Sequence, residues 1–191
     1  EEFPPTNLSQ SLFSLYNGST LISDLVLEYT GSGLTSSSLY NGSIKDSYYQ
    51  YANLKWIPNT SAANNSASIY LPFLNNGWWS IMITSGSSSG FELHAADKIY
   101  NGNDGTSIGY TSSIINSGTW STSTKAYFAT SSTYEGFSGS LQEIRYYNTI
   151  LSESVFKDYV MNPLSIEGNG VNGTPDQLIF RTALGSELDI T

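Results

Sequence analysis

The sequence predicts an all-β fold, an antiparallel sandwich of two sheets with one short helix. Short runs rich in aromatic and β-branched residues alternate with clusters of Asn, Gly and Ser, at the spacing typical of sandwiches. Only 12% of the 191 residues are charged, whereas 14 residues are tyrosines. The polar surface must therefore come mainly from Ser, Thr, Asn and Gly, as in β-rich proteins. A helical pattern is found at one place, residues 153–160.

The predicted strands follow one another along the chain with short turns between them. The recurring Leu-Tyr-Asn-Gly-Ser at residues 15–19 and 39–43, and Ile-Tyr-Asn-Gly-Asn at 99–103, place Asn-Gly after a β-forming pair, which predicts type I′ hairpin turns. Loops are expected at 85–89 and 111–124, the second containing Ile114 and Ile115. Strands are predicted at residues 11–16, 23–29, 48–57, 67–74, 78–84, 90–95, 106–110, 126–130, 138–147 and 178–181.

Residues 136–163 combine a strand, a turn and a capped helix. Leu141 to Tyr147 interleaves apolar and polar residues, as a half-buried strand does. Ser152 is the expected N-cap, because its hydroxyl can accept from free amides of the first turn. The helix should bury one apolar stripe and end at Asn162 and Pro163. The residues expected to be buried here are Ile144, Val155, Phe156, Tyr159 and Val160.

A family resemblance rests on the same region, in the residues Gly139, Leu141, Gln142, Glu143, Ile144, Arg145, Tyr146, Tyr147, Asn148, Leu151 and Ser152. This run of about fourteen residues resembles the pattern that closes many laminin-G-like domains of the concanavalin A-like lectin/glucanase superfamily. The Trp-containing strand at 78–83 is similar to one that precedes the pattern in that superfamily. The resemblance implies a two-sheet antiparallel jelly-roll sandwich. That fold serves sugar binding, adhesion, protein contact or glycan hydrolysis, so the function stays open.

The predicted organisation is an N-terminal tail at residues 1–8, one sandwich domain at 9–163, and an extension or linker at 164–191. Both ends look cut, so we expect a processed product or part of a longer polypeptide. A net charge of −9 with 7 basic residues argues against binding nucleic acid or anionic membranes. No apolar run approaches the roughly 18 residues of a membrane span. The absence of cysteine excludes disulfides and thiolate metal sites and favours a bacterial or viral source.

Catalysis finds little support in the sequence. The Glu-x-Asp-x-x-Glu strand of the superfamily's glucanases is absent. The nearest pair of carboxylates, Asp24 and Glu28, would lie about 13 Å apart on a strand, too far for either glycosidase geometry. His94 is the only histidine, with Asp97 three residues on, and we expect it at a sheet surface or edge. The sequence therefore predicts a protein that is not an enzyme.

Carbohydrate recognition needs an aromatic ring that stacks on a sugar and polar groups that bind its hydroxyls. The possible rings are Trp56, Trp78, Trp79 and Trp120. Trp79 shares a strand face with Ile81 and Ile83, so it is the better core candidate and Trp78 the better exposed one. Trp120 stands in a polar loop, where it could instead fold back over the core. The candidate ligand-binding residues are Trp120, Trp78, Asn103 and Asp104.

A calcium site is the second feature that the resemblance implies, because related domains often carry one on their loops. Asn103 and Asp104 offer hard oxygen ligands in the turn Asn-Gly-Asn-Asp-Gly, and Asp97 is near them in sequence. The alternative is an ordinary hairpin turn, for which such residues are also typical. Calcium is the one cofactor that we consider.

The function predicted is a non-enzymatic recognition module, glycan-binding or adhesive, within a larger virion or cell-surface structural protein. Residues 159–168 resemble sequence from structural proteins of viruses of aquatic microbes, tailed phages among them. We therefore expect a location on the virion surface or outside the cell, with glycans or neighbouring structural chains as partners; a homo-oligomer stays open. The main alternative is a purely architectural domain for assembly of a particle or appendage. A glycan lyase or hydrolase with an unrecognised site is a weaker one.

Overall fold

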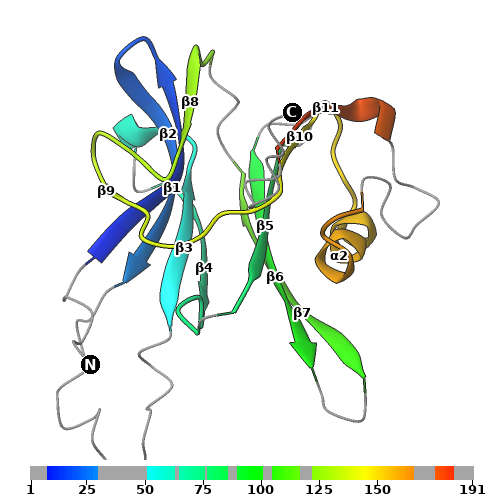
Figure 1. The fold of residues 1–191 in the computed structure, drawn as a ribbon. Helices are drawn as coiled ribbons and strands as arrows, with labels where there is room; N and C mark the ends of the chain where they lie inside the picture. The colour runs from blue at the N-terminus through cyan, green and yellow to red at the C-terminus, as the bar shows by residue number, and fades with distance from the viewer. Residues whose placement is uncertain are drawn as a thin grey trace, which may run out of the picture. The chain divides into compact units, whose positions relative to one another are not determined.

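The computed structural model describes residues 8–29, 51–62, 65–75, 77–85, 90–100, 105–116, 122–165 and 175–182. This part of the chain is mostly β-strand, in sheets whose neighbouring strands are mainly antiparallel, and it contains one α-helix, α2 (Figure 1). The predicted all-β class is thus confirmed. The chain forms two compact units, residues 1–95 with 111–138 and residues 96–110 with 139–191.

The largest sheet lies in the first unit. Its strand order is β4-β3-β2-β1-β8, and β9 also pairs with β1. Its strands pair in antiparallel fashion, except that β9 pairs with β1 in parallel. The strands are β1 (Leu8–Asn17), β2 (Thr20–Tyr29), β3 (Ala52–Ile57), β4 (Ala67–Leu71), β8 (Lys125–Phe128) and β9 (Glu135–Gly136), with a 3-10 turn, η2 (Thr60–Ala62), after β3.

Two chemical features end strands earlier than predicted. β4 stops at Leu71 because Pro72 follows, and proline has no amide hydrogen for a ladder. β8 stops at Phe128 because Ala129 has a φ of 58°, outside the extended region. Both strands therefore exist where the sequence predicts them but are shorter.

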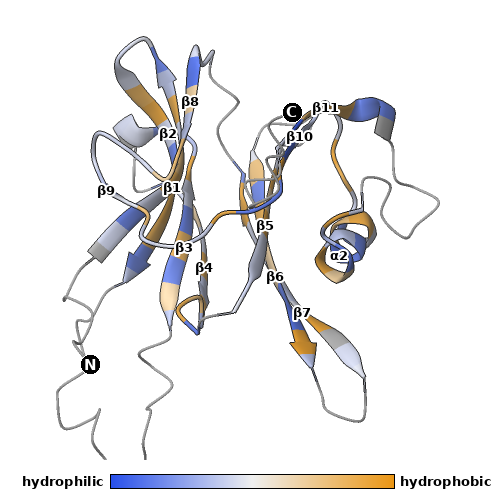
Figure 2. Ribbon diagram, viewed as in Figure 1, coloured by the Kyte–Doolittle hydropathy of each residue, from blue (hydrophilic) through white to orange (hydrophobic). Residues whose placement is uncertain are grey.

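The two faces of this sheet differ in polarity. One face, the apolar face, carries buried Leu25 and Leu27 of β2, Leu54 and Trp56 of β3, and Ile69 of β4. Hydrophobic and hydrophilic bands alternate along β3 in Figure 2, as strand periodicity requires. The opposite face, the polar face, carries Asp24 and Glu28 of β2, Asn53 and Lys55 of β3, and Ser68 and Tyr70 of β4.

A second sheet has the order β5-β6-β7, with β5 (Trp79–Ser85), β6 (Phe91–Tyr100) and β7 (Thr106–Ile115). The Phe91 ring at the start of β6 lies 5.7 Å from the Trp56 ring of β3, measured between centroids, and both side chains are buried. β7 continues through Ile114 and Ile115, where a loop was expected, and that prediction is wrong. Ile115 is buried, and burial of this side chain favours the longer strand.

The hairpin between β1 and β2 turns one residue later than predicted. Asn17 pairs with Thr20, so the central residues are Gly18 and Ser19 rather than Asn17 and Gly18. Gly18 has a φ of 61°, whereas Asn17 and Ser19 have negative φ values. A positive φ at the first central position alone is the type II′ pattern, which glycine adopts without strain. The other two Asn-Gly pairs lie outside the described residues.

The second unit contains a two-stranded antiparallel sheet, β10 (Ile144–Tyr147) with β11 (Leu178–Thr182), the helix α2 (Glu153–Met161) and a 3-10 turn, η4 (Pro175–Gln177). The ends of β6 and β7, residues 96–100 and 106–110, also belong to it. The predicted strand at 138–147 is shorter, because Glu143 has a φ of 55° and no extended conformation is possible there.

The helix α2 matches its prediction closely. The Ser152 side chain accepts a hydrogen bond from the Val155 amide at 3.4 Å, which confirms the N-cap. Its buried residues are Val155, Phe156, Tyr159 and Val160, as expected. Ile144, expected to be buried, is only half-buried, because its two-stranded sheet covers it incompletely. No described helix has the length and hydropathy needed to cross a membrane.

Candidate functional site

The tryptophans divide into exposed and covered residues. Trp78, just before β5, is 63% exposed, the largest exposure of any described tryptophan. Trp79 is half-buried: its ring lies 4.7 Å from that of Phe73, and its Nε1 donates to Asn75 Oδ1 at 3.3 Å. Trp56 is fully buried and cannot stack on a sugar, so it is removed from the possible rings. The predicted contrast between Trp78 and Trp79 is confirmed.

The turn before Trp78 is held by one side chain. Asn75 Oδ1 accepts from the Gly77 amide at 2.8 Å as well as from Trp79. This bond closes an Asx turn, a local arrangement in which the side chain replaces a backbone acceptor. Trp78 directly follows this turn, and its ring is exposed to solvent.

The other predicted site residues are placed only in part. Trp120, Asn103 and Asp104 lie outside the described residues, so their roles stay predictions. Asp97 is half-buried on β6, and burial raises the pKa of its carboxyl. A Cβ added at Gly109 on β7 would lie 2.4 Å from Asp97 Oδ1. The position of the Asp97 carboxylate therefore requires glycine at residue 109. Within the described ranges, His, Asp and Glu form no group of three that could hold a metal.

His94 is buried on β6, the central strand of its sheet, rather than at a surface or edge as expected. Its Nε2 lies 3.3 Å from Thr84 Oγ1 and 3.8 Å from a Glu92 carboxylate oxygen. These contacts give the ring a hydrogen-bonding role within the sheet.

The polar face carries a row of side chains that sequence reasoning missed. The register pairs Tyr70 of β4 with Asn53 of β3, Asn53 with Glu28 of β2, and Glu28 with Ser9 of β1. We call these four residues the Tyr70 row. The Tyr70 side chain is 55% exposed, and the Tyr51 ring lies beside it with a centroid distance of 5.2 Å.

Polar neighbours border this row. Lys55 forms an ion pair with Glu28, and Ser68 Oγ lies 3.5 Å from Asn53 Oδ1. An aromatic ring, an amide, a hydroxyl and a balanced ion pair thus share one face of regular strands. The alternation Tyr51-x-Asn53-x-Lys55 was the available signal in the sequence, but the cross-strand partners were not readable from it.

A buried carboxylate lies on the same face, beside β1. Asp24 is fully buried and accepts hydrogen bonds from Ser11 Oγ at 2.6 Å and Ser131 Oγ at 2.7 Å. Ser14 Oγ donates to the Thr130 carbonyl at 2.7 Å. Ser131 and Thr130 belong to the segment between β8 and β9, residues 129–134, which we call the covering segment (Figure 1). Burial raises the pKa of Asp24 to about 6, although both serine bonds act to lower it.

The surroundings of Asp24 suit fastening better than catalysis. The Ser132 amide donates to the Tyr16 hydroxyl oxygen at 2.6 Å. Burial acts to raise the pKa of Tyr16, but hydrogen bonds with Ser132 and Ser131 outweigh it, so this pKa is lowered. A carboxyl with a raised pKa is a candidate general acid. Asp24, however, is covered by the segment that it binds and is out of reach of substrate.

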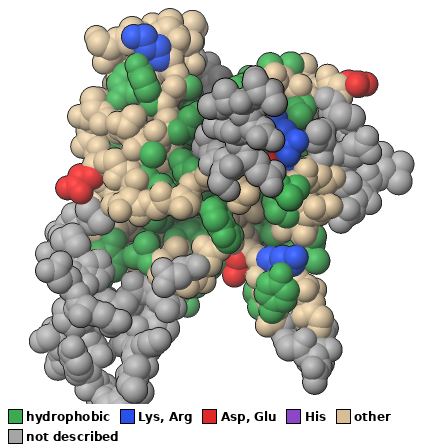
Figure 3. All heavy atoms as spheres, viewed as in Figure 1, with side chains coloured by type: hydrophobic (Ala, Val, Ile, Leu, Met, Phe, Trp, Pro, Cys, Tyr) green, Lys and Arg blue, Asp and Glu red, His purple; other side chains and the backbone are tan. Residues whose placement is uncertain are grey.

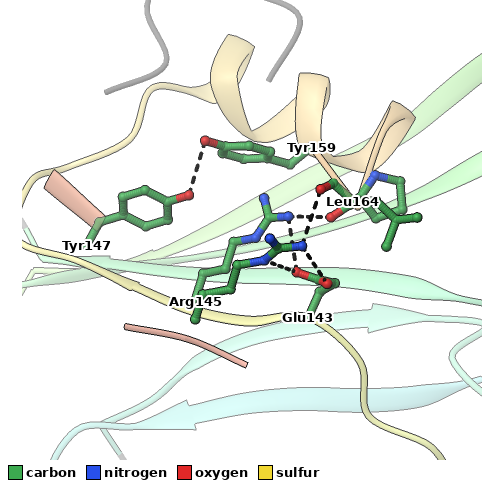
Figure 4. A network of polar contacts seen from close by, with 7 residues as sticks. Glu143, Arg145, Tyr147, Tyr159 and Leu164 are labelled. Atoms are coloured by element: carbon green, nitrogen blue, oxygen red, sulfur yellow. Dashed lines mark hydrogen bonds and ion pairs between the residues drawn. The ribbon is translucent and has the colours of Figure 1, made fainter. Parts of the chain in front are cut away.

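The second unit holds a separate charged network (Figure 4). Arg181 binds Glu143 through two bonds of 2.9 Å, and Arg145 Nη2 lies 3.2 Å from the same carboxylate. The Arg145 guanidinium also lies over the Tyr159 ring, 4.5 Å from its centroid. The bonds from Arg181, the largest cause, and from Arg145 lower the pKa of Glu143 despite burial.

The network joins β10, β11 and the chain after α2. Arg145 donates to the Pro163 carbonyl, Arg181 to the Leu164 carbonyl at 3.2 Å, and Tyr147 OH donates to Tyr159 OH at 3.1 Å. Burial, the largest cause, raises the pKa of Tyr159 to about 12. The Glu, Arg and Tyr of the family-like run are therefore structural here.

Comparison with known proteins gives no relative. No family model, no curated protein and no solved structure matches this chain. The resemblance to laminin-G-like domains thus rests on its short sequence pattern alone.

Proposed function

We propose that this chain is a non-enzymatic recognition module that binds glycans through exposed aromatic side chains, on a jelly-roll sandwich of concanavalin A-like type. The observation that carries the proposal is Trp78. Its ring is 63% exposed, whereas the neighbouring Trp79 is half-buried and bonded. Keeping a large apolar ring in water costs free energy, and sugar C–H faces are natural partners for such rings.

The polar chemistry of the described residues supports recognition over catalysis. Asp24 and Glu143, two carboxylates with shifted pKa values, are engaged by Ser11 and Ser131 in one case and by Arg145 and Arg181 in the other. Those groups fasten backbone segments. We therefore keep the proposal of a binding protein, acting on the virion surface or outside the cell within a larger structural polypeptide.

An architectural function is the second candidate, and exposed aromatics on β10 and β11 favour it. Tyr146 and Phe180 are directly opposite each other and are 59% and 49% exposed. Such a pair would fit a neighbouring protein chain, since aromatic residues are enriched at the cores of interfaces. In that reading the chain would help to assemble a particle or appendage.

A glycan array, probed with and without calcium, tests the main proposal. We expect binding to at least one glycan and about a tenfold or greater loss for Trp78→Ala, by analogy with aromatic stacking on bases, which is worth about 1–3 kcal/mol. Tyr127→Ala is the matched control, because Tyr127 is an exposed aromatic residue on β8. An array without signal under both conditions, or full binding by Trp78→Ala, would overturn the assignment of glycan binding to Trp78.

A further inference from the structure

We propose that the polar face of β2, β3 and β4 is a second glycan-binding surface, on which Tyr70 stacks on a neutral sugar while Asn53 and Glu28 bind hydroxyls of the same chain. The inference rests on the proposed function and adds a site on the flat part of a sheet, apart from the turn that presents Trp78. Uncharged polysaccharide is the class of ligand that it commits to.

The register places the contacts in line. Neighbouring strands lie about 4.8 Å apart, so the three steps from Tyr70 through Asn53 and Glu28 to Ser9 span about 14 Å. A glycan running across the strands would meet an aromatic ring, then an amide, then a carboxylate and a hydroxyl. This order provides stacking at one end and hydrogen bonds along the rest. In ligand sites, an apolar contact of this kind is combined with a few polar groups that fix the orientation of the ligand.

The aromatic end is oriented before a ligand arrives. The rings of Tyr51 and Tyr70 lie 5.2 Å apart at an interplanar angle of 37°. The Tyr70 side chain stays 55% exposed and so buries little surface on folding, whereas its neighbour Ile69 is buried on the apolar face. A side chain held on a regular strand loses less entropy on binding than one on a loop.

Charge selects the class of ligand. Lys55 and Glu28 form an ion pair, so the charges that border the Tyr70 row balance each other, and the remaining carboxylate of this face, Asp24, is fully buried. The chain carries a net charge of −9, and Figure 3 shows described charged side chains only in small scattered groups on the face in view. Polyanionic glycans would be repelled by this charge, whereas a neutral chain is not.

A second tyrosine, Tyr134, lies toward the β1 end of the Tyr70 row. Tyr134 of the covering segment is half-buried, and burial, together with the nearby carboxylates of Asp24 and Glu28, raises its pKa. β9 pairs with β1, with Glu135 opposite Gln10, so Tyr134 comes just before a strand next to β1, which forms the end of the row opposite Tyr70. The surface therefore has an aromatic residue toward each end and polar groups between.

Affinity electrophoresis in gels containing soluble polysaccharides tests the inference on the full chain. The probes are a neutral β-glucan, a neutral xylan, a neutral galactomannan and anionic alginate. We expect retardation by at least one neutral probe, a tenfold or greater loss of affinity for Tyr70→Ala, near-normal affinity for Tyr70→Phe, and a smaller loss for Asn53→Ala. Tyr127→Ala, on β8, is the control and should bind normally.

The outcomes separate the two sites. If a neutral polysaccharide binds, Trp78→Ala weakens it and Tyr70→Ala does not, the polar-face site is wrong while the proposed function stands. Retardation by alginate alone refutes the choice of neutral ligands. If no probe retards the wild-type chain, the polar-face site is wrong, and the glycan array alone decides the proposed function. Melting curves check each variant, and if Tyr70→Ala unfolds, Tyr70→Ser and Asn53→Ala decide by the same criteria.

Discussion

Replacing Asp24 by Asn should stabilise this protein at neutral pH. Asp24 is fully buried and its acceptors are filled by two neutral hydroxyl donors, Ser11 and Ser131. Burial raises the pKa of this carboxyl from 3.8 to about 6, so the folded protein binds the proton more tightly than the unfolded chain, and the ionised form present at neutral pH is destabilising. Asn has nearly the same shape as the protonated acid and carries no charge at any pH. The exchange therefore removes the free-energy cost of an ionised buried group.

The magnitude follows from the pKa shift. The folded state binds a proton more tightly than the unfolded state, so the cost is absent below pH 3.8, grows between pH 3.8 and about 6, and is complete above about 6. A shift from 3.8 to about 6 corresponds to about 3 kcal/mol at roughly 1.36 kcal/mol per unit. For a chain of this size that difference raises the melting temperature by about 6–12 °C.

Urea unfolding of both proteins at pH values from 4 to 8 measures the effect. The variant should exceed the wild type by about 3 kcal/mol at pH 7, and the two should converge as the pH falls to 4. Subtracting the free energy of unfolding of the wild type from that of the variant at each pH cancels the contributions of groups common to both proteins, among them His94 and Asp97. The account of Asp24 would be refuted if the difference in free energy of unfolding did not change with pH. It would also be refuted if the wild type became more stable relative to the variant as the pH rises.

Two further substitutions test the fold. Glu143→Gln should lower the free energy of unfolding in urea by about 3 kcal/mol, because it leaves two arginines without their shared carboxylate. The control is Glu153→Gln, in the exposed ion pair on α2, which should cost less than about 0.5 kcal/mol. Equal effects of the two substitutions would contradict a structural role for the network. Gly90→Ala should cost about 2 kcal/mol or more, because Gly90 has a φ of 116° and its added Cβ would lie 2.5 Å from the Ile115 carbonyl oxygen. Gly18→Ala, in open space at a φ of 61°, should cost about 1 kcal/mol, and the reverse order would count against the close approach.

Local sequence signals located most of the strands and the helix. The alternation of apolar and polar residues in β2, β3 and β5 and the turn clusters between them depend on neighbours along the chain, which a sequence displays directly. The helix α2 was predicted within one residue, because Ser152 caps it and Asn162 ends it locally. The exposed position of Trp78 followed from the same alternation.

The features that were missed depend on residues far apart in the chain. Asp24 is 13 residues from Ser11 and 107 from Ser131, so no local pattern shows that they share a site. The contacts of the Tyr70 row are set by strand register, which depends on pairing rather than on composition. The start of β10 was predicted too early because Glu143 adopts a φ of 55°, and its carboxylate binds an arginine 38 residues away.

The two buried carboxylates show how this chain divides its polar groups between fold and surface. Glu143 meets two guanidinium groups, which hold its pKa below the ordinary value, so its charge favours the folded state. Asp24 meets hydroxyls, which satisfy its hydrogen bonds but do not balance its charge. Both tie segments to strands, and neither is presented to a ligand. The exposed rings of Trp78 and Tyr70 have no comparable part in the folded core, and for that reason binding is the role that we propose for them.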